Sequence, residues 1–89
     1  MQECRRFFVS GKVQGVFFRA STAKIAKALG IRGYARNLTD GRVEVLAYGS
    51  PDSVAELANW LLQGPPASSV SELHSEVVSV EVPAGFATG

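Results

Sequence analysis

The sequence predicts an α+β fold of two layers, in which two helices cover one face of a four-stranded antiparallel sheet. Three observations support this prediction. Four runs of residues have the composition or alternation of β-strands, and two other segments repeat apolar residues at helical spacing. The six segments follow one another in the order β-α-β-β-α-β. Because 89 residues suffice for one hydrophobic core, we expect a single domain over residues 1–89.

The first strand and the first helix are predicted from residue type and spacing. Residues Arg5–Lys12 are rich in aromatic and β-branched side chains, and alternation directs Phe7 and Val9 toward the core. Residues Ser21–Leu29 continue a pattern of apolar side chains at steps of three and four, which indicates a helix with one buried face. Gly30 follows as a helix-ending glycine.

A hairpin is predicted in the middle of the chain. Residues Ile31–Leu38 and Arg42–Tyr48 have the composition of strands, and the turn signal Thr39-Asp40-Gly41 separates them. In the second of these strands, alternation directs three apolar side chains to the core: Val43, Val45 and Ala47.

The second helix has clear boundaries. Ser50 is suited to cap its N-terminus, Pro51 suits its first turn, and Gly64-Pro65-Pro66 ends it. Its predicted buried stripe consists of Val54, Leu57, Ala58 and Leu61, with Trp60 at the edge. The last predicted strand is Val70–Val82, with a polar first half typical of an edge strand and alternating valines in its second half.

In this order the elements give a ferredoxin-like two-layer sandwich. The tail Phe86–Gly89 is short, and its composition leaves open whether it adds a further strand at the edge of the sheet. Folds of this type host many functions, so the function must be read from particular residues.

The composition excludes several kinds of site and of location. A net charge of +1 gives no general attraction to nucleic acid or to an anionic membrane. The chain has one cysteine, Cys4, and one histidine, His74, which excludes an internal disulfide and a zinc cluster. Residues Met1–Glu3 do not resemble a signal sequence, and no apolar run reaches membrane-spanning length. We expect a soluble monomer in the cytoplasm.

The first candidate site is the stretch Gly11–Arg19, between the first strand and the first helix. A glycine-bearing turn before a helix allows backbone N–H groups to converge on an anion, and the helix N-terminus adds positive potential. Arg19 supplies a permanent charge and a fork of donors that suits phosphate. The spacing matches neither a Walker A loop nor a dinucleotide fingerprint. On spacing alone, a tight connection whose glycines only satisfy the backbone is the slightly favoured alternative.

The second candidate is Asn37, at the end of the strand that begins the hairpin. Its side-chain amide both donates and accepts hydrogen bonds, so it could hold a water molecule. Taken alone, Asn37 is better explained as a turn residue that bonds its own backbone before Thr39-Asp40-Gly41.

Together the two stretches resemble the signatures of the acylphosphatase family. Gly11-Lys12-Val13-Gln14-Gly15-Val16-Phe17-Phe18-Arg19 is similar to its first signature, and Gly33-Tyr34-Ala35-Arg36-Asn37 is similar to the start of its second. The second continues with three spaced residues, Gly41, Val43 and Gly49. The resemblance runs from about Phe7 to Phe86 and implies the same ferredoxin-like sandwich that the element order predicts independently.

The resemblance implies an activity and the residues that perform it. It implies hydrolysis of a small-molecule acyl phosphate, with inorganic phosphate as a product and no metal or organic cofactor. The Arg19 side chain would bind the phosphoryl group, and Asn37 would orient the attacking water. The backbone N–H groups implied to bind phosphate are those of Gln14, Gly15, Val16, Phe17, Phe18 and Arg19.

Two other functions are compatible with parts of the sequence. The stretch Gly11–Arg19, called the cradle below, could bind phosphate or an acyl phosphate without turnover. The presence of both Arg19 and Asn37 nevertheless favours an enzyme. RNA-recognition domains share the element order, and Arg32-Gly33-Tyr34-Ala35 opens like one of their motifs. Residues 36–38 then interrupt that motif, which also falls on the second strand instead of the third. We therefore expect no nucleic-acid partner.

Overall fold

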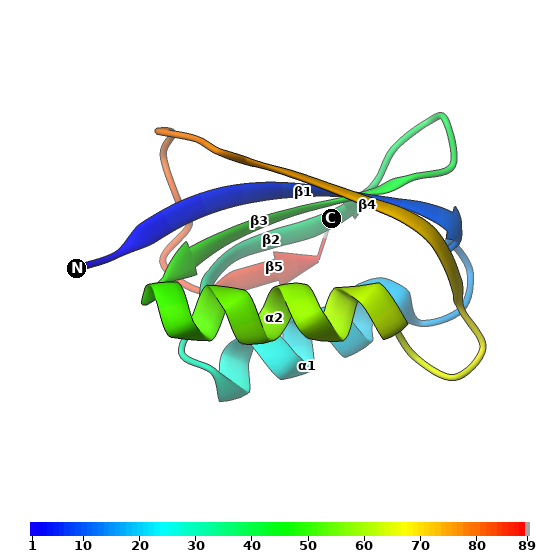
Figure 1. Ribbon diagram of the computed structural model, residues 1–89, viewed down its shortest axis with the longest axis horizontal. Helices are drawn as coiled ribbons and strands as arrows, with labels where there is room; N and C mark the ends of the chain where they lie inside the picture. The colour runs from blue at the N-terminus through cyan, green and yellow to red at the C-terminus, as the bar shows by residue number, and fades with distance from the viewer. Residues whose placement is uncertain (89) are drawn as a thin grey trace.

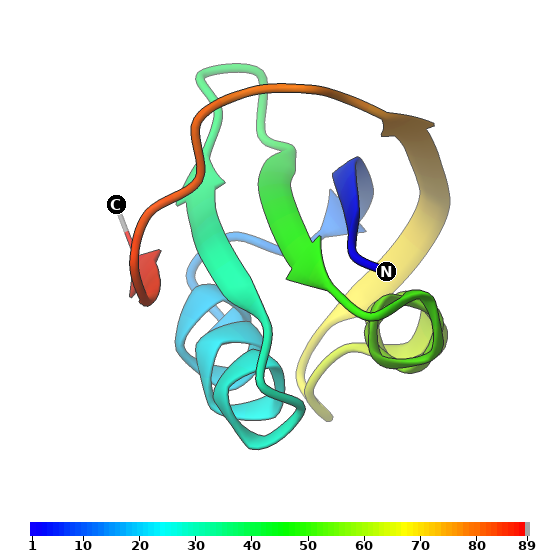
Figure 2. The same cartoon turned by 90° about the vertical axis from the view of Figure 1, so that its left-hand side faces the viewer.

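The computed structural model describes residues 1–88, which form a sheet with two helices packed on one face (Figure 1). The elements are β1 (Glu3–Lys12), α1 (Phe18–Ala28), β2 (Arg32–Asn37), β3 (Val43–Gly49), α2 (Pro51–Gln63), β4 (Ser69–Val77) and β5 (Phe86–Thr88). Across the sheet the strands are ordered β4-β1-β3-β2-β5. Figure 2 shows α1 beneath β2 and α2 nearer the β4 edge, both on the same side. The predicted two-layer α+β architecture is confirmed.

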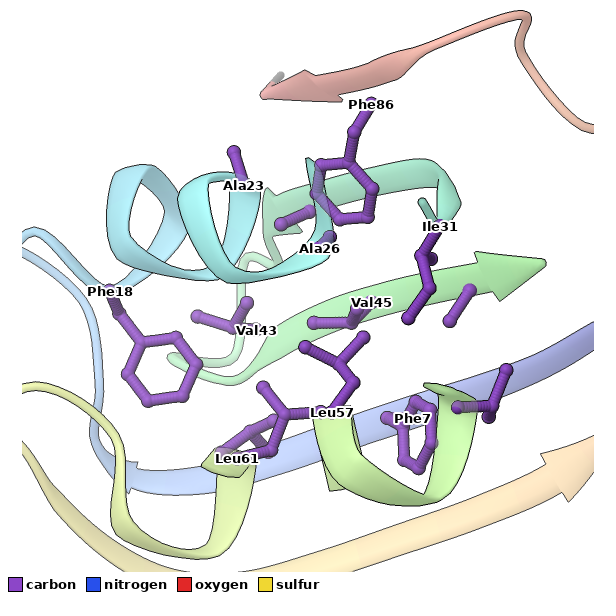
Figure 3. Packing of buried hydrophobic residues seen from close by; sticks show 14 of the residues in the cluster. Phe7, Phe18, Ala23, Ala26, Ile31, Val43, Val45, Leu57, Leu61 and Phe86 are labelled. Atoms are coloured by element: carbon purple, nitrogen blue, oxygen red, sulfur yellow. The ribbon is translucent and has the colours of Figure 1, made fainter. Parts of the chain in front are cut away.

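The sheet has five strands, so the prediction of four strands is wrong, and β5 is the added one. It runs parallel to β2, with Gly33 opposite Phe86, whereas the other strand pairs are antiparallel. The Phe86 side chain anchors β5 because it is buried in the core, and Figure 3 shows it pointing toward the helix that carries Ala26. Ala87 and Thr88 are exposed, so the tail has no apolar alternation to predict a strand. The last tail residue, Gly89, lies outside the described residues.

The predicted strand Val70–Val82 is wrong in its second half, because β4 ends at Val77. The backbone N–H of Val78 still donates to the Cys4 carbonyl at 3.0 Å, and the chain then leaves the sheet. The Arg32 side chain holds the departing segment by donating to the carbonyls of Val82 and Pro83, at 3.1 and 2.9 Å. The alternating valines therefore belong to the connection to β5. The polar first half is an edge strand, as predicted.

The core lies between the sheet and the helices, and it contains the predicted faces of the strands (Figure 3). Its buried members from β1, β3 and α2 are Phe7, Val9, Val43, Val45, Ala47, Val54, Leu57 and Leu61. The Trp60 ring packs at the edge of this cluster, as the sequence indicated, with 5.8 Å between its centroid and that of the Phe18 ring. The Ser50 hydroxyl accepts a hydrogen bond from the Ser53 N–H at 3.2 Å, which confirms the predicted N-cap of α2.

The face of the sheet opposite the helices carries a buried carboxylate. The Glu44 side chain is 5% exposed and accepts hydrogen bonds from Arg36 Nε at 2.7 Å and from the Tyr34 hydroxyl at 2.9 Å. Arg6 Nε lies 2.9 Å away without hydrogen-bond alignment, so its contribution is Coulombic. Burial alone raises the pKa of Glu44, but the hydrogen bonds and the positive charges outweigh burial and hold that pKa below its ordinary value.

Glu44→Gln is expected to lower the free energy of unfolding at neutral pH by about 1–2 kcal/mol. The loss is no larger because Arg6 and Arg36 are partly exposed, so water solvates them once the carboxylate is removed. Because the pKa of Glu44 is lower in the folded chain, its stabilisation is present above the unfolded-state pKa and is lost as the pH falls through the folded-state value. Urea unfolding at neutral and at acidic pH measures both effects. The wild type should lose more stability on acidification than Glu44→Gln does; equal losses would contradict this account.

Candidate active site

The cradle begins where β1 passes the edge strand. The register between β1 and β4 shifts between Ser10 and Gly11, where the chain comes close to Ser69. Gly11 has φ +122°, and a Cβ atom there would collide with the Ser69 carbonyl oxygen. A side chain at this position is therefore excluded both by the backbone conformation and by the close approach. The glycine allows β1 to end beside β4 and the chain to turn toward α1.

Two residues of the turn adopt the left-handed backbone conformation, Gly15 with φ 72° and Phe17 with φ 60°. Turns of this kind direct successive backbone N–H groups toward one side, where they can surround an anion. The helix begins at Phe18, three residues before the predicted start at Ser21, and the Ser21 N–H donates to the Phe17 carbonyl at 3.0 Å. Phe18 and Arg19 therefore belong to the first turn of α1.

The N-terminus of α1 differs from that of α2. In the described residues α1 has no side-chain cap and no acidic residue in its first turn, whereas α2 has the Ser50 cap and Asp52. The first N–H groups of a helix lack partners within the helix, and together they favour a negative charge. The start of α1 is thus suited to an external anion.

A pocket of about 320 Å³ opens at the start of α1 and contains both predicted catalytic side chains, Arg19 and Asn37. It is lined by Val13, Gly15, Phe17, Phe18, Arg19, Ala20, Asn37 and Thr88. Other hollows have volumes of about 390 to 430 Å³, so size does not distinguish this one. What distinguishes it is the meeting of an arginine, an asparagine amide and a left-handed turn. Gln14 and Val16, also predicted to bind phosphate through their N–H groups, are not among the lining residues.

Three lining residues were not predicted from the sequence: Val13, Ala20 and Thr88. Val13 lies within the predicted stretch Gly11–Arg19, just before the residues implied to bind phosphate, and Ala20 directly follows that stretch. Thr88 reaches the pocket because β5 pairs with β2 and sets Thr88 opposite Ala35, two residues before Asn37. The only sequence signal for this placement is Phe86, an isolated large apolar residue near the end of the chain.

The Gln14 side chain connects the cradle to the hairpin that carries Asn37. Its amide nitrogen donates to the Leu38 carbonyl at 2.7 Å and to the Arg42 carbonyl at 3.0 Å. The same two hairpin residues are joined to each other, since the Leu38 N–H donates to the Arg42 carbonyl at 2.8 Å. Gln14 thereby fixes the end of β2 against the turn before α1.

The remaining titratable candidates of the sequence lie outside this pocket. His74 is exposed on β4 and stacks with Phe8, with 6.4 Å between ring centroids. Cys4 is half-buried, and burial raises the pKa of its thiol, which disfavours the reactive thiolate. Among residues 1–88, no three side chains of His, Cys, Asp or Glu gather as a metal site. Within the same range no helix combines the length and the apolar character needed to cross a membrane.

The fold and the pocket define a class: a two-layer α+β domain in which an arginine at the start of a helix and an asparagine at the end of a strand line one pocket. Residues 5–88 match the sequence profile described as acylphosphatase. The acylphosphatase of Alkalilimnicola ehrlichii is 56% identical over 86 residues, which cover 97% of each chain. The chain belongs to the acylphosphatase family of enzymes.

Solved structures of acylphosphatases share the fold. The enzyme from Coxiella burnetii superposes with a TM-score of 0.94 and 43% sequence identity, covering 99% of this chain and 93% of that one. The enzyme from Bacillus subtilis gives a TM-score of 0.93 with 31% identity, covering 100% and 99% of the two chains.

Proposed function

We propose that this protein hydrolyses the carboxyl–phosphate bond of acyl phosphates by binding the phosphoryl group at Arg19 and directing a water held by Asn37 onto phosphorus. The observation that carries the proposal is the pocket that Arg19, Asn37 and the uncapped start of α1 share. The guanidinium and the backbone N–H groups of Gly15, Phe17, Phe18 and Arg19 neutralise the phosphoryl oxygens. The N–H groups of Gln14 and Val16 complete the proposed set. The side-chain carbonyl oxygen of Asn37 accepts a hydrogen bond from the water and so aligns the water oxygen with phosphorus.

The chemistry needs few residues. A carboxylate leaves as an anion whose conjugate acid has a pKa of about 4, so no general acid is required. Phosphoryl transfer passes through a loose transition state with charge spread over the equatorial oxygens, which N–H donors and a guanidinium stabilise directly. A phosphoryl oxygen of the substrate takes the proton of the attacking water. The products are a carboxylate and inorganic phosphate, formed without a metal or an organic cofactor.

RNA binding at the outer face of the sheet has little support from the side chains there. Arginines already lie over three of its aromatic rings: Arg32 over Tyr48, Arg36 over Tyr34 and Arg42 over Phe8, at 4.8 to 5.3 Å from the ring centroids. A stacked base would have to displace these contacts.

We propose that the partner is a small acyl phosphate and that the protein acts as a cytoplasmic monomer with one domain over residues 1–89.

The test is hydrolysis of benzoyl phosphate and acetyl phosphate by the purified protein in the presence of a chelator. The proposal predicts turnover well above spontaneous hydrolysis, unchanged by the chelator and inhibited competitively by inorganic phosphate. Phosphate binding without turnover would support a binding module in place of an enzyme. Turnover abolished by the chelator would contradict the metal-free mechanism.

A further inference from the structure

Phe17 has a conformation and an exposure that folding does not explain. It is the residue before α1, with φ 60° and ψ 23°, a left-handed conformation that glycine and asparagine adopt more readily. Its side chain is 82% exposed and does not cap the helix. The neighbouring aromatic residue, Phe18, is by contrast 2% exposed and belongs to the core. The ring of Phe17 therefore contributes little to the core that anchors the start of α1.

The ring does line the pocket that holds Arg19 and Asn37. Most of the other side chains of this pocket that come from the cradle and the first turn of α1 are apolar: Val13, Phe18 and Ala20. Of the apolar side chains in the pocket, that of Phe17 is both large and exposed. The pocket thus combines a polar set suited to a phosphoryl group with an apolar surface beside it.

In phosphoryl transfer the attacking and the leaving oxygens are roughly in line with phosphorus. If the water is held by Asn37 on β2, the acyl group leaves on the side of phosphorus away from that residue. Phe17 lines the same pocket from a different element, the turn before α1, and its aromatic ring is exposed there. An aromatic ring offers a large, rigid apolar surface to a flat or apolar group.

We propose that the Phe17 ring is the acyl-group subsite, and that it makes the protein prefer acyl phosphates with an aromatic or extended apolar acyl group over acetyl phosphate. This inference rests on the proposed function, because it uses the placement of the phosphoryl group by Arg19 and of the water by Asn37. Burial of the acyl group against the ring stabilises the bound substrate without any new charge.

Two variants separate the ring from the backbone at this position. Phe17→Asn removes the ring, while asparagine tolerates the left-handed conformation. Phe17→Tyr keeps an aromatic face. Leu62→Asn is a matched control, because Leu62 is another exposed apolar residue, 56% exposed on α2, and does not line the pocket.

The readout is the ratio of kcat/KM for benzoyl phosphate to that for acetyl phosphate, which cancels losses common to both substrates. Phe17→Asn is expected to lower this ratio by about tenfold, the scale of discrimination that one apolar contact surface supplies. Phe17→Tyr should retain most of the wild-type ratio, and Leu62→Asn should retain all of it. An unchanged ratio in Phe17→Asn would show that the Phe17 ring does not contact the acyl group, and it would overturn the proposed subsite.

A binding measurement distinguishes failure of the subsite from failure of the proposed function. Calorimetric titration with phenylphosphonate and methylphosphonate requires no turnover. Tighter binding of phenylphosphonate, lost in Phe17→Asn and kept in Phe17→Tyr, would support the subsite even in a protein that hydrolysed neither substrate. Equal affinities of the wild type for the two phosphonates would overturn it even in an active enzyme.

Discussion

Arg19→Ala is expected to lower kcat/KM for benzoyl phosphate by about a hundredfold or more, the usual cost of removing a donor that stabilises transition-state charge. The guanidinium shares the pocket with Gly15 and Asn37 and lies in the first turn of α1. Its fork of donors can contact two phosphoryl oxygens at once, which no neighbouring N–H group replaces. The same substitution should weaken inhibition by inorganic phosphate, because the charge also binds the ground state.

Two further variants make the Arg19 prediction specific. Arg19→Lys keeps the charge without the fork, so its activity should fall between those of the wild type and of Arg19→Ala. Lys24→Ala removes one positive charge from the exposed face of the same helix and should retain wild-type kinetics. If Lys24→Ala lost as much activity as Arg19→Ala, the loss would reflect the overall positive potential of the helix and not a contact made in the pocket.

Asn37→Ala is expected to lower kcat by about a hundredfold, because the attacking water loses the group that aligns it with phosphorus. The inhibition constant of inorganic phosphate should stay close to that of the wild type, since the cradle and Arg19 are untouched. This separation of kcat from phosphate affinity distinguishes Asn37 from Arg19. Asn59→Ala, at an exposed position on α2, is the matched control for loss of a surface amide. A near-wild-type kcat in Asn37→Ala would remove Asn37 from the mechanism.

The elements that local rules determine were predicted correctly. The hairpin of β2 and β3 follows from Thr39-Asp40-Gly41, and the start of α2 follows from Ser50 and Pro51, because each signal and its result lie within a few residues. The start of α1 was misplaced since the left-handed residue that precedes it, Phe17, carries a side chain of a type seldom found in that conformation.

The strand errors have a common cause in long-range packing. Alternating valines predict a strand only where one face is covered, and of the three in this segment, Val78, Val80 and Val82, none is buried and Val80 is 44% exposed. Conversely, β5 forms although its sequence lacks alternation, because Phe86 fills the core and the backbone pairs with β2, more than fifty residues earlier. The neighbouring sequence shows neither whether one face of a strand is covered nor which distant strand its backbone pairs with.

The same limit applies to the site. Arg19 and Asn37 could be predicted because two sequence signatures mark them, and the structure places them in one pocket. The contacts of the Gln14 side chain and the position of Thr88 depend on segments that meet only in the folded chain. Sequence reasoning therefore found the polar side chains of the proposed chemistry but missed part of what holds and surrounds them.

The central claim is that a water held by Asn37 attacks phosphorus while Arg19 and the cradle hold the phosphoryl group. Hydrolysis of benzoyl phosphate in ¹⁸O-labelled water, followed by mass spectrometry of both products, tests this claim directly. Attack on phosphorus predicts that the label appears in inorganic phosphate and is absent from benzoate. Label in benzoate would show that water attacks the carbonyl carbon and would contradict the proposed mechanism.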